Sequence, residues 1–132
     1  MEAIDLLDII VKGESSTVQF KERVNDAYSI ATEMVAFSNS QGGLIIVGVN
    51  DKSGALNGLS FDEIQATNQL FVNAASDNVK SPITIFTEQV LVNEQTLIVV
   101  RIKEGSDKPY RDNRGVVWVK NGSDKRKVVS ND

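Results

Sequence analysis

Three carboxylates beside predicted strands are the side chains best suited to metal chemistry. Glu14 and Glu22 flank a strand predicted at 17–21, and Asp51 follows an apolar strand predicted at 44–49. Clustered carboxylates can hold Mg²⁺ for phosphodiester hydrolysis. Most Asp and Glu side chains are solvated surface acids, however, and spacing alone favours that interpretation.

Residue types that are missing narrow the chemistry further. The chain of 132 residues has no cysteine and no histidine. This excludes disulfides, thiolate nucleophiles, imidazole bases and zinc sites built on Cys or His. Catalysis would depend on carboxylates, Lys, Tyr or Ser. We therefore expect no cofactor and no resident metal.

A glycine pair has part of the pattern of a nucleotide site. Gly43 and Gly48 have the glycine spacing of a phosphate-binding P-loop, but Val49 and Asn50 stand where Lys and Ser/Thr belong. The predicted strand also lies between the glycines and not before them. The pattern favours close backbone packing or turn geometry over nucleotide binding.

The charges are segregated along the chain. The net charge is −4, which by itself argues weakly against a nucleic-acid partner. Residues 1–100 hold five basic and thirteen acidic residues, a net of −8, whereas residues 101–132 hold nine basic and five acidic residues, a net of +4. This asymmetry favours a polyanion-binding surface at one end, although a solvated terminal segment has the same signature.

Basic residues recur through the last part of the chain, with two aromatic residues among them. Lys and Arg on paired strands and their turn could neutralise phosphates, and Tyr110 or Trp118 could stack on a base. An exposed strand edge guarded by lysines is the alternative. The basic residues of this segment are Arg101, Lys103, Lys108, Arg111, Arg114, Lys120, Lys125, Arg126 and Lys127.

Hydrophobic periodicity predicts three helices and five strands, in the order α-β-α-β-α-β-β-β. The helices are expected at 3–11, about 27–40 and 60–78, and the strands at 17–21, 44–49, 83–92, 96–103 and 116–120. Asp26 is the predicted N-cap of the second helix. A capping box at 60–63 begins the third, which should bury Phe61, Ile64, Phe71 and Ala75. The mixed order favours one α/β (α+β) domain, a mixed sheet with helices packed on it.

The two ends of the chain carry separate expectations. The domain is expected to span 1–122, and residues 123–132 are polar and predicted to be a tail or a linker toward a further region. No apolar run of about 18 residues exists, so no membrane partner is expected. Without the features of a signal peptide at the N-terminus, a cytoplasmic location is the default.

Several short motifs in a fixed order resemble the Schlafen AlbA-type domain. The resemblance covers about residues 13–123, and its specificity comes from the order and spacing of the motifs together. They are Gly13-Glu14-Ser15, Gln19-Phe20-Lys21, Ala36-Phe37-Ser38-Asn39 with Gly42-Gly43, Gly48-Val49-Asn50-Asp51 with Gly54 and Gly58, Pro109-Tyr110, and Val119-Lys120-Asn121-Gly122-Ser123.

The resemblance implies an AlbA-like fold and a nucleic-acid-binding role in bacterial transcriptional regulators, DNA more than RNA. Because AlbA-like folds often pair, a homodimer is expected. We expect the binding residues to be Lys21, Lys103, Lys108, Arg111, Arg114, Lys120 and Lys125. The resemblance assigns structural roles to Phe37, Asn39, Gly42, Gly43, Gly48, Gly54 and Gly58.

Similarity to metal-dependent Schlafen nucleases implies an alternative function. Their acidic triad would correspond to Glu14, Gln19 and, less directly, Asp51. Gln19 retains the shape of glutamate but lacks the negative charge that a divalent cation requires. This departure argues against a nuclease, and no catalytic residue is expected. A module for oligomerisation or sensing, without direct nucleic-acid contact, is the third possibility.

Overall fold

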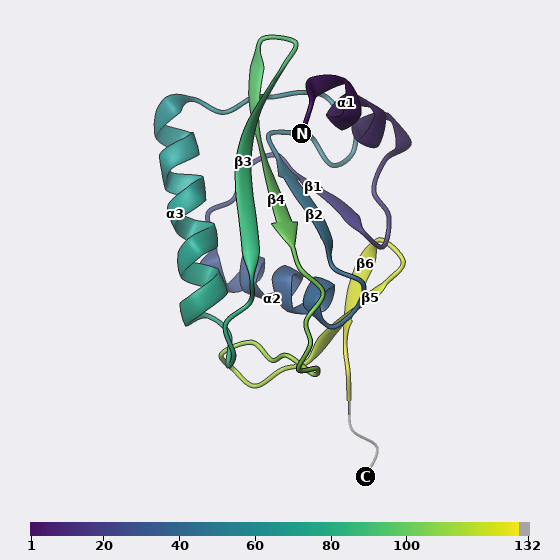
Figure 1. Ribbon diagram of the computed structural model, residues 1–132, viewed down its shortest axis with the longest axis vertical. Coiled ribbons are helices and arrows are strands. Elements are labelled where there is room, and N and C mark those ends of the chain that lie inside the picture. Colours follow the sequence, from purple (N-terminus) through teal and green to yellow (C-terminus); the bar gives the residue numbers. More distant parts are fainter. Residues whose placement is uncertain (130–132) are drawn as a thin grey trace.

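The computed structural model describes residues 1–129 and contains three helices and six strands in those residues (Figure 1). The element types and their order follow the prediction through the fifth strand. The elements are α1 (Ala3–Lys12), β1 (Val18–Lys21), α2 (Ala27–Ser38), β2 (Gly43–Val47), α3 (Phe61–Asp77), β3 (Ile85–Val92), β4 (Gln95–Ile102), β5 (Trp118–Asn121) and β6 (Asp124–Lys127).

Four strands form a mixed sheet in the order β1-β2-β4-β3. β1 pairs with β2 in parallel, and the other two pairs are antiparallel. The apolar run of β2 is buried on both faces, as predicted, because β2 lies inside the sheet and helices cover both of its faces. The fold is therefore the expected α+β arrangement with helices packed on a mixed sheet.

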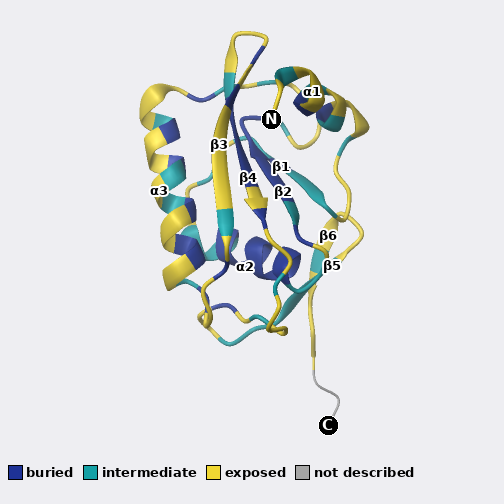
Figure 2. Cartoon of the chain, in the orientation of Figure 1, coloured by how far each residue is buried: buried dark blue, intermediate teal, exposed yellow. Residues whose placement is uncertain are grey.

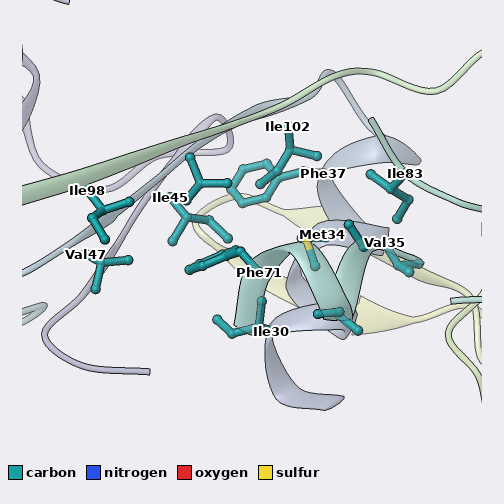
Figure 3. Packing of buried hydrophobic residues seen from close by; sticks show 14 of the residues in the cluster. Ile30, Met34, Val35, Phe37, Ile45, Val47, Phe71, Ile83, Ile98 and Ile102 are labelled. Carbon is teal, nitrogen blue, oxygen red and sulfur yellow. The ribbon is translucent and has the colours of Figure 1, made fainter. Parts of the chain in front are cut away.

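The main core lies between the sheet and the helices α2 and α3. Figure 3 shows Phe37 and Met34 of α2, Phe71 of α3, and sheet residues such as Ile45 and Ile98 packed together. A second cluster on the other face of the sheet packs Leu6 and Ile10 of α1 against β1, β2, β3 and β4. α1 has only ten residues, so it covers one part of its face.

Both predicted helix starts are present. The Asp26 carboxylate accepts hydrogen bonds from the backbone N–H groups of Tyr28 and Ser29 at the start of α2. Ser60 and Glu63 form the reciprocal capping box of α3. Phe61, by contrast, is 74% exposed and not buried as expected, because it is the first residue of α3 and the buried stripe begins one turn later at Ile64.

The C-terminal segment differs from the prediction. Residues 123–132 were expected to be an unanchored tail, yet β6 pairs with β5 in antiparallel register, from Asn121 with Asp124 to Trp118 with Lys127. Gly122, with a φ of 63°, begins the two-residue connection between the strands. β6 consists of charged residues only, so its pairing comes from the backbone and could not be predicted from hydrophobic alternation. The part of the expected tail beyond Val129 lies outside the described residues.

The β5–β6 hairpin stands apart from the main sheet and packs against α2. In the described residues 1–129, no helix is both long and apolar enough to cross a bilayer.

Candidate nucleic-acid interface

Asn39 at the end of α2 holds the segment that carries the late basic residues. Its side-chain amide nitrogen donates to the carbonyl oxygens of Tyr110 (2.9 Å) and Trp118 (2.8 Å). Its side-chain oxygen accepts from the backbone N–H of Tyr110 at 2.6 Å. A single amide thus fixes two points of the segment leading into β5, which explains the place of Asn39 among the motif residues.

The buried carboxylate of Asp112 organises the turn that precedes β5. One oxygen accepts from the Tyr28 hydroxyl (2.7 Å) and the Trp118 indole N–H (2.9 Å). The other accepts from the backbone N–H groups of Arg114 and Val116, both at 2.9 Å. Burial opposes ionisation of Asp112, but these four hydrogen bonds outweigh it and hold its pKa below the usual value. Asp112 is therefore the charged acceptor that fixes both aromatic side chains.

The same hydrogen bond keeps Tyr28 protonated. Donation to Asp112, together with burial, raises the pKa of the Tyr28 hydroxyl above its ordinary value, although Arg114 opposes this shift. The Arg114 guanidinium lies 3.7 Å from the centre of the Tyr28 ring. Arg114 is thereby placed on the same surface as the aromatic pair.

Two cations from β6 lie close to the Trp118 ring. The Nζ atoms of Lys125 and Lys127 lie 5.4 and 5.5 Å from the centre of its ring. Because β6 pairs with β5, residues that the sequence suggested were a free tail form a basic edge around the indole. We call the surface of Tyr28, Arg114, Trp118, Lys125 and Lys127 the aromatic–basic face.

A buried glutamate joins this face to β1. Glu33, on α2, is only 4% exposed, and its Oε1 atom lies 2.6 Å from Lys125 Nζ and 3.9 Å from Lys21 Nζ. The Lys120 ammonium interacts electrostatically with the carboxylates of Glu33 and Glu14. Its Nζ atom lies 4.7 Å from the centre of the Phe37 ring. Three lysines thus gather around one buried carboxylate.

Lys120 has a perturbed pKa. Burial lowers the pKa of its ammonium, and the attraction of Glu33 and Glu14 only partly offsets this. The ammonium donates to the carbonyl of Ser123 at 2.9 Å, across the hairpin connection.

The predicted binding residues do not form one cluster. Lys21, Lys120 and Lys125 lie around Glu33, and Arg114 lies on the aromatic–basic face. Arg111 is exposed on the same turn, where its guanidinium donates to the carbonyl of Gly115. Two others lie elsewhere: Lys108 pairs with Glu104 at 2.7 Å, and Lys103 follows β4 on the main sheet.

The candidate acidic triad is not assembled as a metal site. The Glu14 carboxylate accepts a hydrogen bond from the backbone N–H of Phe20 at 2.9 Å, so it satisfies one backbone donor on the free edge of β1. Asp51 is exposed in the turn after β2. Among residues 1–129, no group of three or more Asp, Glu, His or Cys side chains could hold a metal ion. Glu22 is engaged with the side-chain amides of Asn50 and Asn57, and this ties down the loop after β2.

Several motif glycines allow close approach of the backbone. A Cβ atom on Gly43 would lie 2.5 Å from the carbonyl oxygen of Thr17 and 2.7 Å from the Phe37 ring. One on Gly42 would lie 2.7 Å from backbone atoms of Ile102 and Glu104 at the end of β4, and Gly58 is similarly crowded by Gln95. Gly48, with a φ of 105°, would also meet Leu97. Gly54 has open space around it, and its φ of 75° serves a turn.

Sequence reasoning missed Glu33, Tyr28 and Asp112. Glu33 stands within an otherwise apolar helix face, and that interruption was the available signal. In the sequence, Asp112 has the pattern of an ordinary turn residue. Asp112 accepts hydrogen bonds from Tyr28, which lies 84 positions away, and from Trp118, which lies 6 positions away.

Comparisons with known proteins agree with this architecture. A solved structure of the DIP2311 protein from Corynebacterium diphtheriae is similar with a TM-score of 0.63 and 21% identity over 96% of this chain, which spans only 30% of that chain. The N-terminal domain of a protein from Nitrosomonas europaea, described as related to the ATP-dependent DNA helicase RecG, is similar with a TM-score of 0.66 and 24% identity. That alignment covers 99% of this chain and 96% of the other. At these identities the likeness establishes the fold.

No curated protein matches the chain significantly. The family described as "Schlafen, AlbA_2" matches residues 14–129 and so includes β6 and the cations around Trp118. The chain therefore belongs to the Schlafen AlbA_2 family.

Proposed function

We propose that this chain is a DNA-binding module of a bacterial transcriptional regulator, which binds the phosphate backbone through the aromatic–basic face and the lysines around Glu33. The observation that carries the proposal is that the ammonium groups of Lys125 and Lys127 lie 5.4 and 5.5 Å from the centre of the Trp118 ring. An aromatic ring with cations close to it can contact a base or sugar while the cations bind phosphates. The DNA helicase-related description of the Nitrosomonas protein is consistent with a partner of this class.

Charge placement supports this site over others on the chain. Lys125 and Lys127 lie on β6, and Lys120 and Trp118 on the adjacent β5, so one rigid hairpin carries all four side chains. The ammonium of Lys21 reaches toward the same buried Glu33 from β1. The proposed contacts of these lysines are with the phosphate backbone of a nucleic acid, so we expect little recognition of base sequence.

We further propose that the module acts without catalysis. Gln19 is neutral where a metal site would need a carboxylate, and the Glu14 carboxylate is already used by the Phe20 N–H. The Gly43–Gly48 segment does not support an ATPase either, because Val49 stands where the lysine of a phosphate-binding P-loop belongs. Incubation with RNA and DNA in Mn²⁺, beside Glu14→Ala, tests this directly, and cleavage that depends on Glu14 would contradict the proposal.

The binding proposal is tested by fluorescence anisotropy with a labelled duplex at roughly 50 and 200 mM salt. Neutralising several phosphates predicts a loss of affinity of about ten-fold or more across this range. The double variant Lys125→Glu with Lys127→Glu should abolish most of the binding at either salt concentration. Lys52→Glu, on the exposed loop after β2, is the control; it reverses one charge where the hairpin variant reverses two, so the losses are compared per reversed charge.

Two results would overturn the proposal. One is no binding of duplex DNA at low salt by the unmodified chain. The other is an equal loss of affinity per reversed charge in the hairpin variant and in Lys52→Glu, which would mean that only net charge matters. Light scattering in the same buffers tests the expected homodimer.

A further inference from the structure

A second surface lies on the part of the main sheet that α1 leaves uncovered. One row of residues crosses all four strands there: Val18 of β1 pairs with Leu44 of β2, Leu44 with Arg101 of β4, and Arg101 with Phe86 of β3. Paired residues on neighbouring strands point to the same face of a sheet. The row therefore forms one continuous strip from edge to edge.

This strip faces away from α2 and α3. Leu44 belongs to the core cluster under α1, whereas its neighbour Ile45 belongs to the cluster under α2 and α3. Figure 1 shows α1 beside the end of the sheet near the β3–β4 turn, with no helix on this side over the opposite end of β3 and β4. Figure 2 shows exposed positions along β3 and at the end of β4.

The strip lies in a shallow hollow of about 410 Å³. Its lining includes Phe86, Arg101, Lys103, Leu44 and the backbone of Gly42 and Gly43. Among residues 1–129, none of the residues that line it is acidic. Glu88, two positions beyond Phe86 on the same strand, already pairs with the terminal ammonium of Met1 at 2.9 Å. The hollow is thus both apolar and positively charged.

The groups that line the hollow are free to bind. Phe86 is 61% exposed, and none of the cation–π pairs of the described residues involves its ring. Arg101 and Lys103 form no ion pair with any residue in the range 1–129, whereas Lys108, Lys125 and Arg23 each have an acidic partner. A single exposed Phe is ordinary. An exposed Phe beside two free cations, in a hollow without acids, has the composition of a single-strand site.

We propose that this strip, which we call the sheet face, binds a segment of single-stranded nucleic acid. One base stacks on the Phe86 ring, and the adjacent phosphates pair with Arg101 and Lys103. Stacking platforms of this kind accept any base, because every base has an aromatic face. A duplex cannot use the site in this way, because its bases are stacked on each other and not available to Phe86.

The sheet face is separate from the aromatic–basic face. The hairpin of the latter packs on α2, on the opposite side of the sheet. The inference goes beyond the proposed function, which concerns phosphate contacts by the hairpin. If both hold, the chain binds duplex on one side and an unpaired strand on the other.

The experiment compares a labelled oligothymidine strand with a labelled duplex in anisotropy titrations of the full chain. Phe86→Ala should weaken binding of the single strand by roughly ten-fold, the effect of losing one stacked base, and leave duplex binding unchanged. Phe86→Tyr should retain the affinity because it keeps the ring. Arg101→Gln should weaken single-strand binding and lower its salt dependence by about one phosphate contact.

Leu91→Ala is the matched control. Leu91 is also a large exposed apolar residue on β3, 65% exposed, but alternation places it on the other face of the strand, with Ile85. The titration should give the same single-strand affinity for this variant as for the unmodified chain. Thermal unfolding of each variant shows whether a loss of affinity comes from a loss of folding.

The outcomes separate the two sites. Unchanged single-strand affinity in Phe86→Ala, or equal losses in Phe86→Ala and Leu91→Ala, would overturn the sheet-face proposal. It would also be overturned if Phe86→Ala converted a dimer to a monomer in light scattering, because the strip would then bind a second copy. A chain that binds single strands through Phe86 but no duplex would contradict the proposed function alone.

Discussion

Lys125 Nζ lies 2.6 Å from Oε1 of Glu33, a residue 92 positions earlier in the chain. This ion pair joins the terminal hairpin to α2 and brings the lysine beside Trp118. It also compensates part of the positive charge that the proposed interface would offer to DNA. Glu33 therefore both positions the interface and restrains its charge.

Removal of the Glu33 charge should strengthen DNA binding. In Glu33→Gln the amide can still accept from Lys125, but Lys21, Lys120 and Lys125 are no longer neutralised locally. We expect a gain in affinity of about two- to ten-fold at low salt, of the order of one added phosphate contact. Anisotropy titration measures it, and Glu104→Gln, which frees Lys108 instead, is the control. A loss of affinity in a folded Glu33→Gln protein would contradict this role.

Asp112 should be important for stability. In Asp112→Asn the amide nitrogen cannot accept from the Tyr28 hydroxyl or the Trp118 N–H, so a donor loses its acceptor in a buried site. Each unsatisfied donor is expected to lower the free energy of unfolding by about 1–3 kcal/mol. Urea unfolding followed by Trp118 fluorescence measures the change. Asn113→Ala, at the neighbouring exposed position, should stay within about 0.5 kcal/mol of the unmodified chain.

Acid should destabilise the fold through protonation of Asp112. The pKa of Asp112 is lower in the folded chain than its ordinary value of 3.8, so its ionisation stabilises the fold above that value. That contribution is lost as the pH falls through the lowered folded pKa. Urea midpoints of the unmodified chain should therefore fall over this acid range, and Asp112→Asn should lack this part of the decrease. Parallel curves for the two proteins would contradict the assignment.

Lys120 should make DNA binding sensitive to alkaline pH. Its pKa is lowered, so it loses its proton at a lower pH than a free lysine, and the affinity should fall as the pH rises through that value. Arginine keeps its charge throughout this range. As the pH rises toward the ordinary lysine value of 10.5, the unmodified chain should lose more affinity than Lys120→Arg. Identical losses would show that Lys120 does not contact DNA.

Truncation distinguishes β6 from the residues that follow the described part of the chain. A chain ending at Asn121 lacks Lys125 and Lys127 and exposes the Trp118 ring, so it should lose most duplex affinity and unfold at a lower temperature. A chain ending at Val129 keeps the hairpin and should match the full chain. Differential scanning calorimetry and anisotropy titration test both. Equal behaviour of the two truncations would mean that β6 has no role.

Local sequence signals predicted most elements of this fold. The capping residues Asp26 and Ser60 placed two helix starts, because capping depends on neighbours within three positions. The apolar run of β2 indicated a strand covered on both faces. The order of short motifs indicated the family, which the match over residues 14–129 confirms.

The sequence by itself determined the element types as far as β5, the family and the concentration of basic residues in the last third of the chain. Only the tertiary structure decided which cations lie together. It paired β6 with β5, separated Lys103 and Lys108 from the hairpin, and placed Glu33 beneath Lys125. The physical reason is that side-chain convergence depends on contacts between distant residues and on backbone pairing, and neither leaves a periodic pattern in the sequence. The sheet face was hidden for the same reason, since Phe86 and Arg101 become neighbours only through the register of β3 and β4.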